Sequence, residues 1–118
     1  MTDRRTLLQR LLRLDQPLAE ITKSLNQFGW DSKSSLVTLR REDIVSVLKK
    51  YLHSELTALN IEDWATAIEG REDIELQPEH NDLIREVIFE LANPILSRPL
   101  NMRNAQELIQ RLSHMGLK

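Results

Sequence analysis

The residues of this sequence with the clearest chemical potential are carboxylates, and they stand in neighbouring pairs: Glu62 with Asp63, and Glu72 with Asp73. Glu69 follows Glu62 by close to two helical turns, so the two would share one face of a helix. Such a pair can divide the roles of general acid and general base if a cleft raises the pKa of one member. The surrounding sequence predicts no cleft, so surface carboxylates are the favoured interpretation.

Metal-ligating and nucleophilic residues form no recognisable pattern. His53, His80 and His114 are far apart, and none has a second histidine at ligand spacing. The chain has no cysteine, which excludes disulfides and thiolate metal sites. It also has no Gly-x-Ser-x-Gly motif and no glycine-rich phosphate loop. The sequence therefore predicts a protein that is not an enzyme, with no catalytic residue, no metal and no cofactor.

The formal net charge of −2 conceals an uneven distribution. Residues 1–50 hold ten basic and six acidic side chains, whereas residues 55–79 hold one arginine and eight acids. A charge run is usually solvated surface. It can also be a docking face, since opposite charges speed association and select the partner. The candidate partner-binding residues are Trp30, Glu62, Asp63, Glu69, Glu72, Asp73 and Glu75.

Trp30 is the candidate anchor of such a face, because it lies in a polar loop and on no core stripe. The alternative is that its ring folds back as a lid over the helices.

Six stretches that carry apolar residues at helical spacing would position these side chains. The predicted helices span residues 6–14, 17–28, 41–53, 61–69, 78–93 and 102–115. We expect an all-α fold, a compact irregular or orthogonal bundle of about five to six short helices, with Trp64 near its centre. The length predicts a single helical domain, residues 1–118, with an N-terminal helical hairpin at 4–28 and a helical core at 40–116.

The connecting segments carry more specific expectations. Thr38 is the predicted N-cap of the third helix, and Asn60 that of the fourth. Residues 36–39 are expected to be extended but too isolated to form a sheet. Residues 71–77 are expected to be a charged link, and the two-proline loop at 95–100 is expected to hold its apolar side chains against the core.

The helices predicted at 41–53 and 61–69 are joined by a short link, as in a helix-turn-helix. A recognition helix would present basic or amide side chains to base edges. The second helix instead presents Glu62, Asp63 and Glu69, which phosphates would repel, so the sequence disfavours nucleic-acid binding. No apolar run reaches the length of about 20 residues that a membrane span needs, and no secretory signal is recognisable. We therefore expect a cytoplasmic location.

Three segments, Trp30–Ser32, Arg71–Ile74 and Glu90–Pro94, resemble parts of small, uncharacterised bacterial all-helical proteins. This resemblance implies no activity. Residues 47–58, followed by the Trp64 helix, are similar to the opening of colicin D-type immunity proteins. Those are small acidic helical bundles that bind and block a basic ribonuclease toxin. The resemblance implies that the acids at 62–75 imitate the RNA substrate, and it assigns no individual binding residue.

The sequence leaves two main functions open. The first is a non-enzymatic protein–protein interaction module, in its most specific form an immunity- or antitoxin-like inhibitor that binds a basic toxin domain through the acidic middle segment. The second is a homodimeric regulatory protein with the leucine-rich N-terminal helix as its interface. The remaining alternatives are a helix-turn-helix-like nucleic-acid binder and an enzyme, which would need a deep polar pocket.

Overall fold

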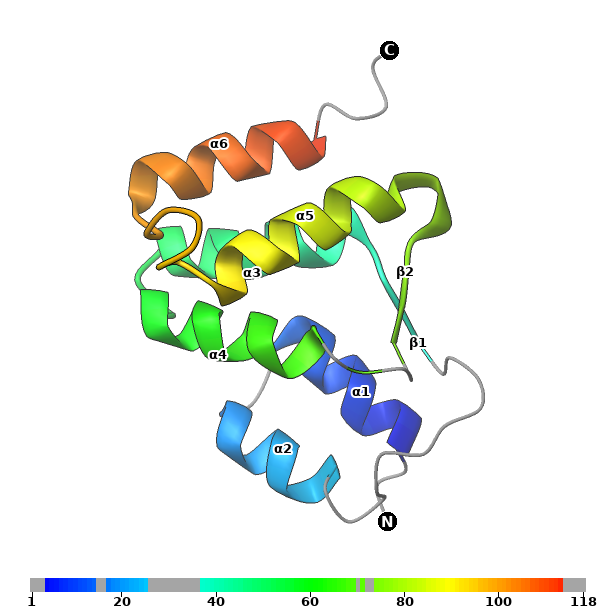
Figure 1. Ribbon diagram of the computed structural model, residues 1–118. Helices are drawn as coiled ribbons and strands as arrows, with labels where there is room; N and C mark the ends of the chain where they lie inside the picture. Colours follow the sequence, from blue (N-terminus) through cyan, green and yellow to red (C-terminus); the bar gives the residue numbers. More distant parts are fainter. Residues whose placement is uncertain (1–3, 15–16, 26–36, 70, 72–73, 114–118) are drawn as a thin grey trace.

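A computed structural model of the protein describes residues 4–14, 17–25, 37–69, 71 and 74–113. These residues form six α-helices, a 3₁₀ turn and two short strands, which confirms the expected mostly helical bundle (Figure 1). In chain order the elements are α1 (Arg4–Arg13), α2 (Leu18–Leu25), β1 (Val37–Leu39), α3 (Arg41–Leu52), α4 (Ala58–Ile68), β2 (Ile74–Leu76), η2 (Pro78–His80), α5 (Asn81–Ala92) and α6 (Met102–Ser113). The expected ends of the second and last helices lie outside the described residues.

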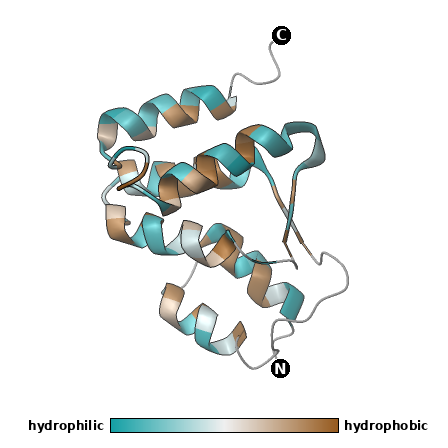
Figure 2. Ribbon diagram, in the orientation of Figure 1, coloured by the Kyte–Doolittle hydropathy of each residue, from teal (hydrophilic) through white to brown (hydrophobic). Residues whose placement is uncertain are grey.

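The helices pack mainly in pairs. Helix α3 packs against α6, α4 against α5, and α1 against both α2 and α3. In Figure 1, α6 lies at the top, α3 and α5 lie below it, α4 comes next, and α1 with α2 closes the bottom. Figure 2 shows brown concentrated in α5 and teal over most of α6, so α5 is the more central of the two. No helix among the described residues has the length and apolar character that a membrane span requires.

One continuous cluster of buried side chains joins all six helices and both strands. Trp64 is fully buried within it, and Val87 and Leu91 are buried as well, as their helical spacing predicted. The leucines of α1 also belong to this cluster: Leu7, Leu8, Leu11 and Leu12. The apolar stripes of the sequence therefore correctly identified the core.

The expectation that residues 36–39 form no sheet was wrong. Strand β1 pairs in parallel with β2, with Val37 opposite Ile74. The link at 71–77 supplies this partner because Ile74 is buried and Glu75, next to it, is exposed, which is the alternation of a strand. Parallel strands need a long crossover connection, and α3 and α4 provide it.

Two helix starts also differ from expectation. The N-cap of α4 is Thr57, whose Oγ1 accepts a 3.1 Å hydrogen bond from the main-chain N–H of Asn60. In return, Asn60 Oδ1 accepts a 2.9 Å bond from the main-chain N–H of Thr57, so Asn60 is the inner half of a capping box. Helix α3 begins after Arg40, whose main-chain N–H donates to Asp43 Oδ2 at 2.9 Å, and Thr38 belongs to β1.

The loop between α5 and α6 does not bury its apolar side chains as expected. Ile95 is 97% exposed and Leu96 74% exposed, whereas Leu100 packs partly against the core. The main-chain N–H groups of Leu96 and Ser97 both donate to the carbonyl oxygen of Asn93 at 3.0 Å. This tight turn carries Ile95 and Leu96 on its outer side, which explains their exposure.

Candidate protein-binding surface

Four of the seven predicted partner-binding residues are described. Glu62 and Asp63 lie on α4, Glu69 immediately follows it, and Glu75 lies on β2. Glu62 is half-buried and the other three are exposed. The remaining three, Trp30, Glu72 and Asp73, lie outside the described residues.

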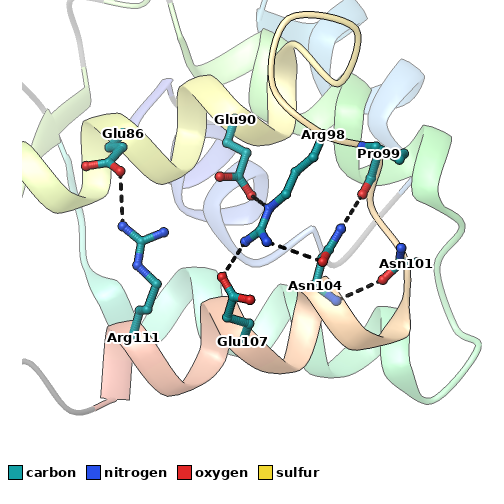
Figure 3. Close-up of polar contacts among 8 residues, drawn as sticks. All are labelled: Glu86, Glu90, Arg98, Pro99, Asn101, Asn104, Glu107 and Arg111. Atoms are coloured by element: carbon teal, nitrogen blue, oxygen red, sulfur yellow. Dashed lines mark hydrogen bonds and ion pairs between the residues drawn. The ribbon is translucent and has the colours of Figure 1, made fainter.

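The carboxylates of α4 have no partner within the described part of the chain. Neither Glu62, Asp63 nor Glu69 makes a hydrogen bond or an ion pair there. Glu86 and Glu90, which point from α5 toward α6, differ because each is paired with an arginine at 3.1 and 3.0 Å respectively (Figure 3). None of the three carboxylates therefore makes a direct ion pair with a described side chain.

Two hollows lie along the pair formed by α4 and α5, which run in opposite directions (Figure 1). The first, of about 230 Å³, is lined by Glu62 together with Leu59 and Pro94. The second, of about 540 Å³, is lined by Glu69 and Phe89 and lies nearer the other end of α4. Glu62 and Glu69 are seven residues apart and share one side of the helix. Glu90 and Arg98 also line the first hollow, and Glu75, Arg71 and Arg85 also line the second.

Large apolar side chains are exposed next to these carboxylates. Leu59 is 62% exposed and Phe89 45% exposed, and each lines one hollow. Ile95 and Leu96 follow Pro94, which lines the first hollow. We use the name α4–α5 face for the exposed or half-buried residues that line these hollows, Leu59, Glu62, Glu69 and Phe89, together with their neighbours along the chain, Asp63, Ile95 and Leu96. Exposed apolar side chains with a polar rim are typical of protein interaction sites.

The sequence pointed to the acids of this face and not to its apolar members. The helix predicted at 61–69 begins after Leu59, which in the structure lies in the first turn of α4. The sequence also predicts that Ile95 and Leu96 are buried with the other apolar side chains of the loop at 95–100, which is wrong. The signal that could have revealed Leu59 is the capping box at Thr57, which places the start of the helix at Ala58. Leu59 is then helical and lies on a different side of the helix from the buried stripe.

Glu75 lies apart from α4, although it also lines the hollow beside Phe89. Its Oε1 accepts a 3.3 Å hydrogen bond from Thr38 Oγ1 across the two strands. This bond already uses one of the carboxylate oxygens of Glu75. Glu75 therefore adds negative charge to the region but offers a partner fewer free hydrogen-bond acceptors.

A saturated polar cluster fixes the loop that carries Ile95 and Leu96 (Figure 3). Arg98 donates to Glu90 at 3.0 Å, to Glu107 at 2.7 Å and to Asn104 at 3.3 Å. Asn104 in turn donates to the carbonyl oxygen of Pro99 at 2.7 Å. The two carboxylates raise the pKa of Arg98 above its usual range, and Arg98 lowers the pKa of Glu107. This arrangement joins α5 and α6 and holds the base of the loop, which indicates a structural role.

No group of three or more His, Asp or Glu side chains in the described part of the chain is arranged to hold a metal ion. His53 is exposed, with its Nδ1 at 4.0 Å from a carboxylate oxygen of Glu55. His80 is the N-cap residue of α5 and belongs to no such group among the described residues. His114 lies outside the described residues.

No protein-family model matches this chain, and neither a curated protein nor a solved structure matches it. The fold and the surface define a small helical bundle with charged and apolar side chains exposed along α4 and α5. Its function is therefore argued from the α4–α5 face.

Proposed function

We propose that the protein is a non-enzymatic recognition domain that binds a basic protein partner through the α4–α5 face. The observation that carries this proposal is the placement of the unpaired carboxylates Glu62 and Glu69 beside the exposed side chains of Leu59 and Phe89. Apolar contacts supply affinity at the centre of an interface, and charges at its rim select the partner and raise the association rate.

The number of exposed apolar residues matters for this function. Each such side chain that becomes buried contributes about 1.5–3 kcal/mol at most, whereas association costs at least about 4 kcal/mol in lost freedom. A single leucine could not hold a partner. Leu59, Phe89, Ile95 and Leu96 together offer a contact of the required kind.

In its most specific form, the partner is a basic toxin domain and the protein is an immunity- or antitoxin-like inhibitor. The resemblance of residues 47–58 and the Trp64 helix to colicin D-type immunity proteins supports this form. The carboxylates of α4 would then take the place of nucleic-acid phosphates in the toxin.

The alternative functions have less support. The leucines of α1 that would form a homodimer interface are buried inside the same chain: Leu7, Leu8, Leu11 and Leu12. Helix α4, which would be the recognition helix of a helix-turn-helix, exposes Asp63 and carries Glu62 and Glu69 on its side. The burial of these leucines therefore argues against the homodimer, and the acids of α4 argue against the nucleic-acid binder.

The test is affinity capture with a charge-reversed face. The wild-type protein is compared with Glu62→Lys/Glu69→Lys and with the matched control Glu20→Lys/Glu79→Lys, which changes two exposed acids outside the face. Circular dichroism checks that all three are folded. We expect the wild type and the control to retain the same basic proteins, and the face variant to lose them. Capture of neutral or acidic proteins alone, or equal capture by all three, would contradict the proposal.

A further inference from the structure

A third hollow lies where α1, β1 and the start of α3 meet, and it shares Glu75 with the hollow beside Phe89. It has a volume of about 350 Å³ and a lining that includes Arg5, Gln9 and Arg13 of α1, and Arg40 before α3. The three α1 residues are spaced four apart, so they follow one side of that helix. The arginine pocket, as we call it, thus draws its three guanidinium groups from two different parts of the chain.

These guanidinium groups have no acceptor within the described residues. Neither Arg5, Arg13 nor Arg40 makes a side-chain hydrogen bond or an ion pair there. Two carboxylates also line the pocket, but neither accepts a hydrogen bond from a described guanidinium group. Asp43 accepts one from the main-chain N–H of Arg40 at 2.9 Å, and Glu75 accepts one from the hydroxyl group of Thr38 at 3.3 Å. Three exposed arginines and two partly occupied carboxylates therefore line the pocket.

Asp43 also lines this pocket, and the charges of two of its arginines act on the pKa of this carboxyl group. Burial raises the pKa of Asp43, while the positive charges of Arg40 and Arg13 act in the opposite direction and Glu42 adds to the rise. The positive end of the α3 dipole lies in the same region and adds to the potential. A ligand with concentrated negative charge would relieve the repulsion among the arginines.

We propose that the arginine pocket binds the phosphate group of a small molecule, with Arg5, Arg13 and Arg40 as the donors. The planar guanidinium fork matches phosphate oxygens in pairs, which makes arginine well suited to this ligand. The volume of about 350 Å³ lies within the usual range of small-molecule sites and exceeds what a phosphate alone would fill. Free phosphate and a nucleoside monophosphate share the recognised group, and the experiment separates them.

The test titrates the full chain with inorganic phosphate, with adenosine monophosphate and with adenosine, followed by backbone amide chemical shifts. We expect saturable shifts at β1 and at the start of α3 with both phosphate compounds and none with adenosine. Tighter binding of the nucleotide would identify a phosphorylated small molecule as the ligand, and equal binding would identify free phosphate. The absence of saturable shifts with both would overturn the proposal.

Matched variants distinguish a site from general charge attraction. Arg13→Gln/Arg40→Gln is expected to weaken phosphate binding at least tenfold, whereas Arg85→Gln/Arg103→Gln, with the same charge change on exposed positions elsewhere, should leave it unchanged. Equal loss in both would overturn the proposal. Should the first variant not fold, Asp43→Asn gives a second test, because removing a negative charge from the lining should strengthen binding. An unchanged or weaker affinity in that variant would contradict the proposal.

Discussion

The indole Nε1 of Trp64 donates a 2.7 Å hydrogen bond to the main-chain carbonyl oxygen of Leu11, and both side chains are fully buried. This bond connects α4 to the last turn of α1. The carbonyl groups of a last helical turn lack helical partners, and the Leu11 oxygen is satisfied by Trp64 and by the N–H of Leu14 at 3.2 Å. Trp64 therefore fastens the N-terminal hairpin to the rest of the core as well as filling space.

We predict that Trp64→Phe lowers the free energy of unfolding by about 2–4 kcal/mol. The substitution leaves a cavity in the core and removes a hydrogen bond from a buried carbonyl group. Urea denaturation followed by far-ultraviolet circular dichroism measures the change. The control is Leu96→Ala, which alters a side chain that is 74% exposed and should change stability by less than about 0.5 kcal/mol. A loss in Trp64→Phe no larger than in the control would contradict this account.

The contact between Arg98 and Glu90 is predicted to stabilise the junction of α5 and α6. The Glu90 side chain is 17% exposed and that of Arg98 is 32% exposed, so their 3.0 Å ion pair is partly shielded from water. A hydrogen bond to a charged group is worth about 1.5–3 kcal/mol, and we expect a coupling of about 1 kcal/mol after solvent screening. A double-mutant cycle with Arg98→Met and Glu90→Gln measures it. Additive effects of the two substitutions would rule the coupling out.

The same junction should respond to acid through Glu107. Its pKa in the folded state lies below the ordinary 4.5 because Arg98 stabilises the carboxylate. A lowered pKa means that the stabilisation is present above pH 4.5 and disappears as the pH falls through the folded-state value. The stability difference between the wild type and Glu107→Gln should therefore shrink as unfolding is followed to lower pH, and a constant difference would contradict the prediction.

Asp43 acts in the opposite direction over a neighbouring pH range. Burial raises its pKa above 3.8, so the folded state holds this proton more tightly than the unfolded state does. The resulting contribution is present at low pH and is lost as the pH rises through the folded-state value. Measuring the Glu107 effect in an Asp43→Asn background removes this opposing term, and the acid dependence attributed to Glu107 should persist there.

The helical part of the fold could be predicted because the spacing of apolar residues along each segment indicates a helix. The stripe that contains Trp64 and the stripe that contains Val87 and Leu91 repeat at the helical period over several turns, and all three residues are buried. The two strands carry no comparable signal, since each is three residues long. Their pairing joins Val37 to Ile74 across 37 positions, and such a contact is decided by the packing of the helices between them.

The candidate surface was predictable only in part, for a similar reason. Charge is visible in a sequence, so the acids of α4 could be assigned to a surface. Whether an apolar side chain in a loop is buried depends on how the turn closes. Ile95 and Leu96 are exposed because the carbonyl oxygen of Asn93 accepts the hydrogen bonds that close the turn. The bond from Arg98 to Glu90 then holds the loop against α5.

The capping box of α4 gives a test of the helix start that the sequence misplaced. Replacing Thr57 by Ala removes the acceptor for the main-chain N–H of Asn60 and should cost about 1 kcal/mol of stability. Thr57→Ser keeps the hydroxyl group and should retain most of it. Urea denaturation measures the free energy of unfolding of both variants and of the wild type. A larger effect of the serine variant than of the alanine variant would be inconsistent with a capping role.

The exposed loop separates binding from stability more cleanly than any other part of the α4–α5 face. Ile95→Ser/Leu96→Ser changes side chains that are 97% and 74% exposed, so the free energy of unfolding should shift by less than about 0.5 kcal/mol. If the loop belongs to the interface, the same variant should lose the basic partner retained by the wild type, because the apolar contact area falls. Leu100→Ser is the contrasting control, since Leu100 packs partly against the core and its change should lower stability. Affinity capture combined with urea denaturation measures both properties. Unchanged partner binding in the Ile95→Ser/Leu96→Ser variant would remove the loop from the interface and leave the hollows beside Glu62 and Glu69 as the part of the face still to be tested.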